Sequence, residues 1–285
     1  MQFILTAEEA KQFSQRIKLD PKREDQSSLD YLNQIIQNFQ ENIPFQNVLL
    51  LATPVEKRRR LNWDEVKNDL LSGQGGLCYS LNLFLHIYLN SIGYKTDLVL
   101  STYSSPNDHT VIIVNDLIQK ADKYMIDVGS GYASSLAIPI DFEDESPYYS
   151  FSYTTMKLKW DENKQNILRI HKSQTSGQEK VILKFHLIPI KDYYVELSEQ
   201  ERIFTDPNFT PFHRILCILT FNKDGARNMQ DKQFVREDIQ TNKLQNEGDE
   251  IQDEHKFVEI CAKEFPSLNS ETCRKAYNHL FNKQN

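Results

Sequence analysis

The spacing of apolar residues changes twice along this chain, and that change limits the folds open to it. Up to residue 92, apolar side chains such as Leu32, Ile35 and Phe39 recur every three or four positions, which is the spacing of one helix face. From residue 97 to residue 187 the chain consists of short β-prone runs separated by Pro, Asn, Asp and Gly. Helical spacing returns after Pro189. The pattern predicts a helical first third, a strand-rich middle third and a largely helical last third.

Local signals place several elements within these thirds. Asn62 followed by Glu65 resembles a capping box, and Gly73 stands where a helix end favours a left-handed residue. Another helix is expected to begin close to Cys78 and to end before Gly93. The expected strands are residues 97–101, 109–114, 124–128, 150–159, 167–171 and 181–187. The expected C-terminal helices are residues 195–202, 212–219, 255–265 and 274–281, with a surface loop or lid edge over residues 238–254.

The composition is that of a globular protein without affinity for polyanions. With 285 residues the chain is long enough for two domains or three small ones. Lys and Arg number 33 against 40 Asp and Glu, and the net charge of −7 argues against binding to nucleic acid or to a membrane surface. No apolar run is long enough to span a bilayer. The start of the chain lacks the basic-then-apolar order of a secretory signal, so we expect a cytoplasmic protein.

The four cysteines are expected to be free thiols. They stand at Cys78, Cys217, Cys261 and Cys273. This number is too small to cross-link a fold of this size, and the sequence contains no C-x-x-C pair. Cys261 and Cys273 have no histidine at ligand spacing, so no metal site is predicted. Cys217 lies in an apolar run that predicts burial and an unreactive thiol.

A glycine-rich turn precedes the first of these cysteines. Cys78 follows Gly75 and Gly76 and stands at the expected first turn of an apolar helix. The free backbone N–H groups and the positive end of the helix dipole favour a thiolate there, and glycine lets a substrate approach the backbone closely. Cys78 is therefore a candidate nucleophile. A small buried side chain after a turn explains the same segment equally well.

A thiolate nucleophile benefits from an imidazole for proton transfer and from a third group that orients the imidazole. His109 heads the apolar run 109–114, and Asp127 lies at the end of another run, just before Gly129. Separations of 31 and 18 residues leave room for a helix and a strand, and then for two adjacent antiparallel strands. Taken singly, His109 is more simply a polar strand-end residue and Asp127 a turn-capping carboxylate. Together with Cys78 they have the order of a papain-like Cys-His-Asp core.

Four segments, in order along the chain, resemble motifs of the arylamine N-acetyltransferases. That family carries Arg-Gly-Gly-x-Cys-x-Glu-x-Asn, a His at the head of an apolar strand, Val-Asp-Val-Gly-Phe-Gly and, upstream, Pro-Phe-Glu-Asn-Leu. The counterparts here are residues 74–82, His109, residues 126–131 and residues 44–48. The resemblance implies an α+β protein with an N-terminal helical bundle, a central β-barrel and a C-terminal α/β lid. The expected divisions are 1–92 with the nucleophile, 93–190 with the His and Asp, and 191–285.

The resemblance also implies an activity, the ping-pong transfer of acetyl from acetyl-CoA to an arylamine, N-hydroxyarylamine or hydrazine. Cys78 would carry the acetyl group as a thioester, His109 would handle the protons, and Asp127 would fix the imidazole tautomer. Backbone N–H groups near Cys78 would stabilise the oxyanion. Acetyl-CoA is then a co-substrate, and neither a permanently bound cofactor nor a metal is implied. The oligomeric state is left open.

Further site residues follow from their positions in the same motifs. Gly76, Leu77, Ser130 and Gly131 are expected to face the substrate. Gln46, Gln74 and Asn82 are expected to support the site. Ser130 stands where the family has Phe, which removes an aromatic wall from the acceptor pocket.

Three departures from the family motifs remove charge. Gln74 replaces the motif Arg, and Gln46 and Ser80 replace motif Glu residues. Removing one partner of a buried ion pair costs about 3–5 kcal/mol, whereas losing both signs together avoids an uncompensated charge. The sequence therefore predicts a neutral contact between the side-chain amides of Gln46 and Gln74.

Two other functions stay open at the level of the sequence. A transglutaminase-like or papain-like amidase uses the same order of Cys, His and Asp. A catalytically weakened paralogue would keep the fold as a binding module, and the three charge losses favour that alternative. The basic run 57–60 is either a site for the CoA phosphates or, more simply, a solvated face.

Overall fold

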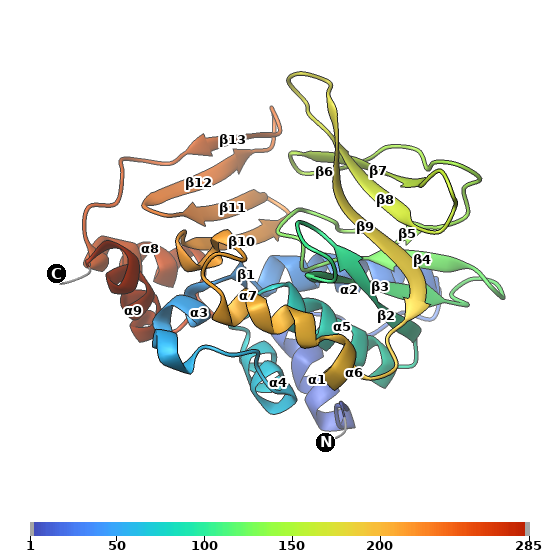
Figure 1. Cartoon of the computed structure of the whole chain (residues 1–285), viewed down its shortest axis with the longest axis horizontal. Helices are drawn as coiled ribbons and strands as arrows, with labels where there is room; N and C mark the ends of the chain where they lie inside the picture. The colour runs from blue at the N-terminus through green and yellow to red at the C-terminus, as the bar shows by residue number, and fades with distance from the viewer. Residues whose placement is uncertain (1–2, 283–285) are drawn as a thin grey trace.

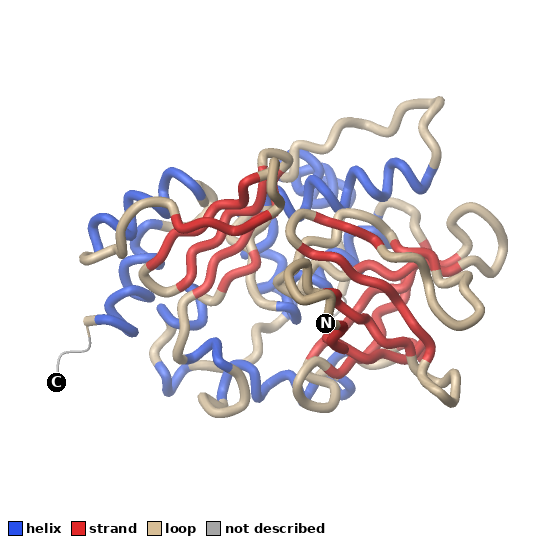
Figure 2. The backbone as a smooth tube through the Cα atoms, turned by 90° about the horizontal axis from the view of Figure 1, so that it is seen from above, coloured by secondary structure: helices blue, strands red, loops and turns tan. Residues whose placement is uncertain are grey.

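The protein contains two antiparallel sheets, which the computed structural model describes over residues 3–282. The larger sheet is formed by β2 (Lys95–Thr102), β3 (His109–Asn115), β4 (Lys123–Ile126), β5 (Ile138–Pro139), β6 (Tyr149–Phe151), β7 (Thr154–Trp160), β8 (Ile167–Lys172) and β9 (Glu179–Pro189). The smaller sheet is formed by β1 (Phe45–Gln46), β10 (Cys217–Asn222), β11 (Gly225–Gln230), β12 (Gln233–Asp238) and β13 (Lys243–Asn246). Their strand orders are β5-β4-β3-β2-β9-β8-β7-β6 and β1-β10-β11-β12-β13. Figure 2 shows the two sheets side by side, with helices around them.

The helices fall into an N-terminal and a C-terminal set. The first set comprises α1 (Ala7–Arg16), α2 (Ser28–Asn42), α3 (Val48–Ala52), the 3₁₀ turn η1 (Val55–Lys57), α4 (Trp63–Ser72) and α5 (Cys78–Ser91). The second comprises α6 (Tyr193–Glu196), η2 (Ser198–Gln200), α7 (Glu201–Thr205), η3 (Pro211–His213), α8 (Glu254–Glu264) and α9 (Ser270–Phe281). In Figure 1 α1 and α5 lie below the larger sheet, α3 lies beside α9, and α8 and α9 lie against the smaller sheet.

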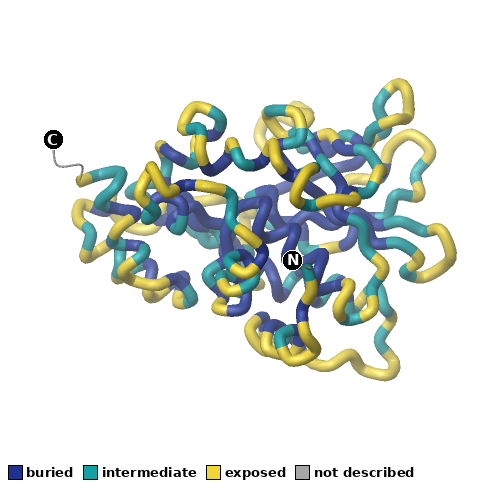
Figure 3. The backbone as a smooth tube through the Cα atoms, turned by 60° about the horizontal axis from the view of Figure 1, so that its bottom comes forward, coloured by how far each residue is buried: buried dark blue, intermediate teal, exposed yellow. Residues whose placement is uncertain are grey.

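The helix signals in the first third are confirmed. Asn62 caps α4 and forms a capping box with Glu65, and Gly73 ends the helix at φ 85° in the left-handed region. The next helix begins at Cys78 as expected, and every residue from Cys78 to Leu89 is buried. A helix that is apolar all round belongs in the core. Figure 3 shows the buried backbone running through the middle of the molecule, with exposed loops at its edges.

The strands that position the site are buried on both faces. In β3 every residue from His109 to Val114 is buried, between β2 on one side and β4 on the other. His109 pairs with Ser101 at the end of the β2–β3 ladder, and β4 ends at Ile126, one residue before Asp127. The predicted strand 150–159 is two strands, because the chain turns at Ser152 with φ 54°.

The prediction of a helix over residues 212–219 is wrong. The 3₁₀ turn η3 ends at His213, and the apolar residues from Cys217 onward form β10, which pairs with β1 on one side and β11 on the other. A short apolar run carries no periodicity that separates a strand from a helix, and here long-range pairing decides. The predicted helix 195–202 is broken into the end of α6, η2 and the start of α7, and β11, β12 and β13 were not expected.

No helix within residues 3–282 combines the length and the hydropathy needed to cross a bilayer.

Candidate active site

The turn that precedes Cys78 is fixed to β1. Gly75 has φ 72°, and an added Cβ would lie 1.9 Å from the carbonyl oxygen of Pro44, so only glycine fits there. The Gly76 N–H donates to the Pro44 carbonyl at 3.2 Å, and the Gln46 N–H donates to the Gly76 carbonyl at 3.0 Å. These two backbone hydrogen bonds hold Cys78 as the first residue of α5.

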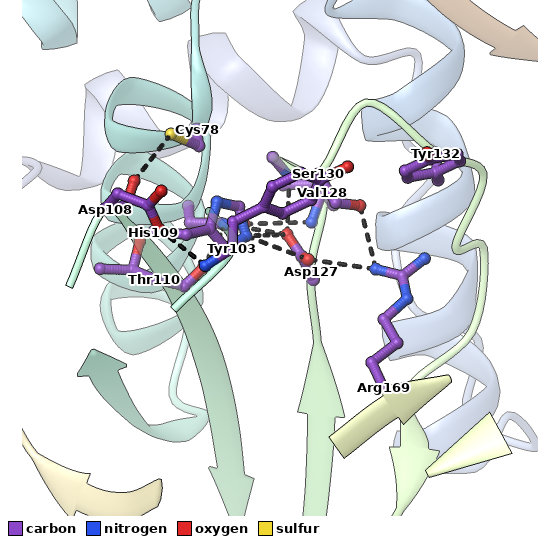
Figure 4. A network of polar contacts seen from close by, with 12 residues as sticks. Cys78, Tyr103, Asp108, His109, Thr110, Asp127, Val128, Ser130, Tyr132 and Arg169 are labelled. Atoms are coloured by element: carbon purple, nitrogen blue, oxygen red, sulfur yellow. Dashed lines mark hydrogen bonds and ion pairs between the residues drawn. The ribbon is translucent and has the colours of Figure 1, made fainter. Parts of the chain in front are cut away.

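His109 and Asp127 form a buried pair. His109 Nε2 lies 3.1 Å from both carboxylate oxygens of Asp127, at the junction of β3 and the segment after β4. Neither side chain has more than 3% of its surface exposed. This contact uses Nε2, so Nδ1 is the ring nitrogen left for Cys78. Figure 4 shows the cysteine, the histidine and the aspartate in sequence across the site.

His109 and Asp127 each stabilise the ionised form of the other. Burial alone would lower the pKa of His109, but the Asp127 carboxylate and the Cys78 side chain outweigh burial and raise it to about 10. Burial would raise the pKa of Asp127, but the His109 and Arg169 cations hold it well below its usual range. The pair is therefore an imidazolium beside a carboxylate at neutral pH.

Two further groups fix the carboxylate. Asn82, one turn after Cys78 on α5, donates through Nδ2 to Asp127 Oδ1 at 3.0 Å and to the Thr110 carbonyl at 2.7 Å. Its Oδ1 accepts from the Val128 N–H at 3.0 Å. The Gly129 N–H also donates to Asp127 Oδ1, at 3.0 Å. Asn82 thus ties α5 to Thr110 on β3 and to the segment that follows β4.

A loop closed by Asp108 lies beside the thiol. Asp108 is buried, and its carboxylate accepts from the backbone N–H groups of Tyr103, Ser104 and Ser105 at 2.7–2.9 Å. This places the Asp108 carbonyl oxygen 3.9 Å from Cys78 Sγ. The sequence interpretation did not single out Asp108, although an Asp after Ser-Ser-Pro-Asn is a typical turn signal.

Arg169 is the second residue that the sequence interpretation missed. It lies on β8 with no exposed surface, and its Nη1 donates to Asp127 Oδ2 at 3.1 Å and to Ser130 Oγ at 3.0 Å. Figure 4 shows the guanidinium approaching Asp127 from the side away from Cys78. The sequence signal that could have identified Arg169 is its position as a charged residue between Leu168 and Ile170 in a β-prone run.

A cavity of about 460 Å³, partly open to solvent, adjoins these residues. From the first two thirds of the chain its lining includes Phe45, Cys78, Tyr103, Ser104, Asp108, His109, Gly129, Ser130, Gly131 and Tyr132. From the C-terminal third it includes Ile203, Thr210, Pro211, Phe212, Ile215, Cys217, Leu219, Asn228 and Gln230. Of the residues expected to face a substrate, Ser130 and Gly131 line this cavity. Gly76 and Leu77 line a different one of about 440 Å³.

The predicted amide contact between Gln46 and Gln74 is wrong. Gln46 Nε2 donates to the backbone carbonyl of Gln74 at 3.1 Å, and Gln46 Oε1 accepts from the Leu49 N–H at 3.1 Å. The Gln74 side chain instead approaches Ser72 Oγ at 3.4 Å. Gln46 still supports the turn, but it does so through the backbone, because both ends of its amide already have main-chain partners.

The basic run 57–60 has mostly internal partners. Arg58 is buried, and its Nη1 and Nη2 lie 2.9 Å from His213 Nδ1 and 3.0 Å from His279 Nε2. Arg59 forms a two-pronged ion pair with Glu65 at 2.6–2.7 Å. This run joins elements of the fold. Within residues 3–282 no group of three or more His, Cys, Asp or Glu is placed to hold a metal ion.

Comparison with known proteins gives a consistent result. A family model described as N-acetyltransferase matches residues 28–269. Probable arylamine N-acetyltransferase 3 of Dictyostelium discoideum is 28% identical over 144 residues, 47% of this chain and 44% of that protein. The alignment thus spans less than half of that relative.

Solved structures share the fold at low sequence identity. The arylamine N-acetyltransferase of Salmonella typhimurium superposes with a TM-score of 0.79 at 15% identity, covering 96% of this chain and 98% of that one. That of Mycobacterium marinum in complex with CoA superposes with a TM-score of 0.76 at 16% identity, covering 95% and 100%. The family model spans most of the sequence and the fold agrees with it, which confirms the resemblance predicted from the motifs. The chain belongs to the N-acetyltransferase family, the family of the arylamine N-acetyltransferases.

Proposed function

We propose that this protein transfers acetyl from acetyl-CoA to an arylamine, N-hydroxyarylamine or hydrazine through an acetylated Cys78. The observation that carries the proposal is the cavity lined by both Cys78 and His109, with Asp127 hydrogen-bonded behind the imidazole. Family membership supports acetyl transfer. The CoA held by the relative from Mycobacterium marinum supports the choice of donor.

The first half of the proposed reaction acetylates the enzyme. In the starting state the proton shared by Cys78 and His109 is on the imidazole, and the Cys78 thiolate attacks the carbonyl carbon of acetyl-CoA. Backbone N–H groups at the first turn of α5 stabilise the oxyanion that forms. The bond between the carbonyl carbon and the CoA sulfur then breaks, and the CoA thiolate takes the proton from His109. The products are CoA thiol, acetyl-Cys78 and a neutral imidazole.

The second half returns the enzyme to its starting state. The amine nitrogen attacks the thioester carbonyl carbon, and His109 takes a proton from that nitrogen. The bond from the carbonyl carbon to Cys78 Sγ breaks, so the sulfur leaves as a thiolate beside the imidazolium. Asp127 keeps the ring oriented with Nδ1 toward the sulfur throughout, as in papain-like enzymes.

A comparison of wild type with Cys78→Ser tests the proposal. With acetyl-CoA and an aromatic amine or hydrazide, wild type is expected to release CoA thiol and N-acetylated amine in equal amounts. The Cys78 peptide should carry acetyl when the amine is left out. Cys78→Ser should lose at least about 10³-fold in rate, because the nucleophile and its base act as a unit, whereas Cys261→Ala, a core cysteine of α8, should keep its activity.

Three results would contradict this assignment. An amidase would cleave an amide or a glutamine side chain and release no CoA. A binding module would show neither acetyl-Cys78 nor transfer. Undiminished transfer by Cys78→Ser would remove the covalent mechanism.

A further inference from the structure

Arg169 is a buried cation whose presence packing alone does not explain. Of its three guanidinium nitrogens, Nη1 has two partners, while Nε and Nη2 have no hydrogen-bond partner among the described residues. Burying a charge is unfavourable unless its hydrogen bonds are satisfied, and an apolar side chain of similar size often gives a more stable protein. The arginine therefore adds to the site something other than folding stability.

Asp127 does not need Arg169 to satisfy its hydrogen bonds. Its carboxylate already accepts from His109 Nε2, from Asn82 Nδ2 and from the Gly129 N–H at 3.0–3.1 Å. The added feature is a positive charge on Oδ2, on the side away from His109 (Figure 4). The contribution of Arg169 is thus mainly its charge.

Ser130 accompanies the arginine. Its hydroxyl oxygen accepts from Arg169 Nη1 at 3.0 Å, and the residue is buried at the edge of the cavity. The related motif has Phe at this position, and a phenyl ring offers no comparable acceptor for a guanidinium. Ser130 and Arg169 therefore form one unit behind Asp127.

We infer that Arg169 is a positioning residue for acyl transfer: from behind Asp127 it holds the carboxylate and offsets its negative charge, so that His109 gives up its proton as readily as it accepts one. This inference rests on the proposed function. It adds to Cys78, His109 and Asp127 a fourth member, together with the serine that holds it.

The two half-reactions explain why such an offset is useful. His109 must give a proton to the CoA sulfur and must later take one from the amine. Against the effect of burial, the Asp127 carboxylate and the Cys78 side chain raise the pKa of His109 to about 10, which favours keeping the proton. A cation on the far side of the carboxylate opposes that effect. It brings the proton affinity of His109 closer to those of the CoA sulfur and the amine with which it exchanges protons.

The other titratable groups around Cys78, His109 and Asp127 do not supply the positive charge that Arg169 places on Asp127. They are Cys78 from α5, Tyr103 and Asp108 from the loop between β2 and β3, Tyr132 from the segment after β4, and His171 from β8. Burial, followed by the Arg169 cation, lowers the pKa of His171 to about 3, so that ring is neutral at neutral pH. Among these described neighbours, Arg169 is the permanent cation on Asp127.

Titration of the His109 ring by NMR tests the inference. The Cys78 thiol is first alkylated with iodoacetamide, which mimics the acetylated state and leaves the imidazole as the titrating member. Arg169→Met and Arg169→Gln should raise the titration midpoint by about one pH unit, because the carboxylate then stabilises the imidazolium without opposition. Arg169→Lys keeps the positive charge, so its midpoint should lie close to that of wild type. Lys172→Met, which removes an exposed cation from the same strand, should change nothing.

Kinetics provides the second readout. In Arg169→Met the pH at which amine-dependent deacetylation reaches half its maximum should rise with the His109 midpoint. Ser130→Ala keeps the charge of Arg169 but removes the acceptor that holds its Nη1, so the guanidinium is held less closely against Asp127 and the His109 midpoint should rise by a few tenths of a unit. This variant preserves the buried charge pair and provides the test if the neutral arginine variants are insoluble.

The outcomes separate this inference from the proposed function. Neutral variants that fold, with an unchanged His109 midpoint and a uniformly lower rate, would reduce Arg169 to a structural role and overturn the inference. An unchanged midpoint in Ser130→Ala would do the same if those variants do not fold. The NMR titration needs neither acetyl-CoA nor an amine, so it stands even if wild type transfers no acetyl group.

Discussion

Two cysteines line the same cavity, but their individual surroundings give them different chemistry. Cys78 heads α5 beside His109, whereas Cys217 lies on β10, where the Asp231 carboxylate acts on its thiol. Burial, and then Asp231, raise the pKa of Cys217 to about 12. At the scale of the residue, access to the cavity is therefore not sufficient for reactivity, because thiolates rather than thiols react.

Alkylation of the folded protein by iodoacetamide at pH 7 tests this difference. The Cys78 peptide is expected to be labelled at least about 10²-fold faster than the Cys217 peptide, as measured by mass spectrometry over time. In urea both should be labelled at similar rates, which controls for peptide detection. Comparable labelling of the two thiols in the folded state would contradict the argument.

At the same scale, the sequence predicted those site residues whose signals are local. Cys78, His109 and Asp127 each stand at the start or end of a predicted element, beside glycine or loop residues, and the structure brings them together. Arg169 could not be placed, because it reaches Asp127 from 42 residues further along the chain. The partner of the Gln46 amide was also not predictable, since a backbone carbonyl has no sequence signature.

At the scale of the element, the turn before α5 depends on the two-residue strand β1. This turn crosses the Pro44 carbonyl so closely that a side chain at Gly75 has no space. Gly177, in the loop between β8 and β9, has nearly the same backbone angle, φ 70° against 72°, but an added Cβ there would meet nothing within 4 Å. The two glycines share the same backbone strain and differ in their surroundings.

A pair of alanine substitutions separates these two effects. Gly177→Ala should cost about 1–2 kcal/mol in free energy of unfolding, from the left-handed backbone alone. Gly75→Ala should cost at least about 3 kcal/mol, because the turn must also move away from β1. Urea unfolding measures both, and acetyl transfer should be lost in Gly75→Ala. Equal stabilities of the two variants would show that the close approach to Pro44 does not matter.

Elements of the first third were predictable because their caps and apolar faces are continuous in sequence. The 212–219 region was not, because Ile218 and Leu219 pair with β1, far back along the chain. The strands β11–β13 contain Arg, Asn, Gln and Lys at half-exposed or exposed positions, so they lack the alternation that identifies a strand.

For the whole molecule, buried histidines set the dependence of stability on pH. Burial lowers the pKa of His86 to about 4. Burial and the Arg169 cation lower the pKa of His171 to about 3. The pKa of His109 is instead raised to about 10. In the unfolded chain all three titrate near 6.5. Below pH 6.5 His86 and His171 bind protons in the unfolded chain but stay neutral in the folded protein, so the free energy of unfolding falls as the pH falls. Above pH 6.5 folded His109 keeps a proton that the unfolded chain loses, so stability falls as the pH rises.

The free energy of unfolding is therefore expected to be greatest near pH 6.5–7. Each net proton gives a slope of about 1.4 kcal/mol per pH unit. On the acid side Asp69, whose pKa burial raises to about 6, offsets one of the protons. Denaturant unfolding at pH 5, 6.5 and 9 measures both sides, and His109→Asn should flatten the alkaline side alone. A steady rise in stability from pH 6.5 to 9 in wild type would refute this account.

The pairing of β1 with β10 also has a consequence for biosynthesis. The Cys217 N–H bonds to the side chain of Asn47, next to β1, across 170 residues of chain. In a growing polypeptide the glycine turn can bond to Pro44 and Gln46, which are already made, but β1 lacks its other partner until β10 has been synthesised. The cell thus handles a nascent chain in which one edge of β1 is still unpaired.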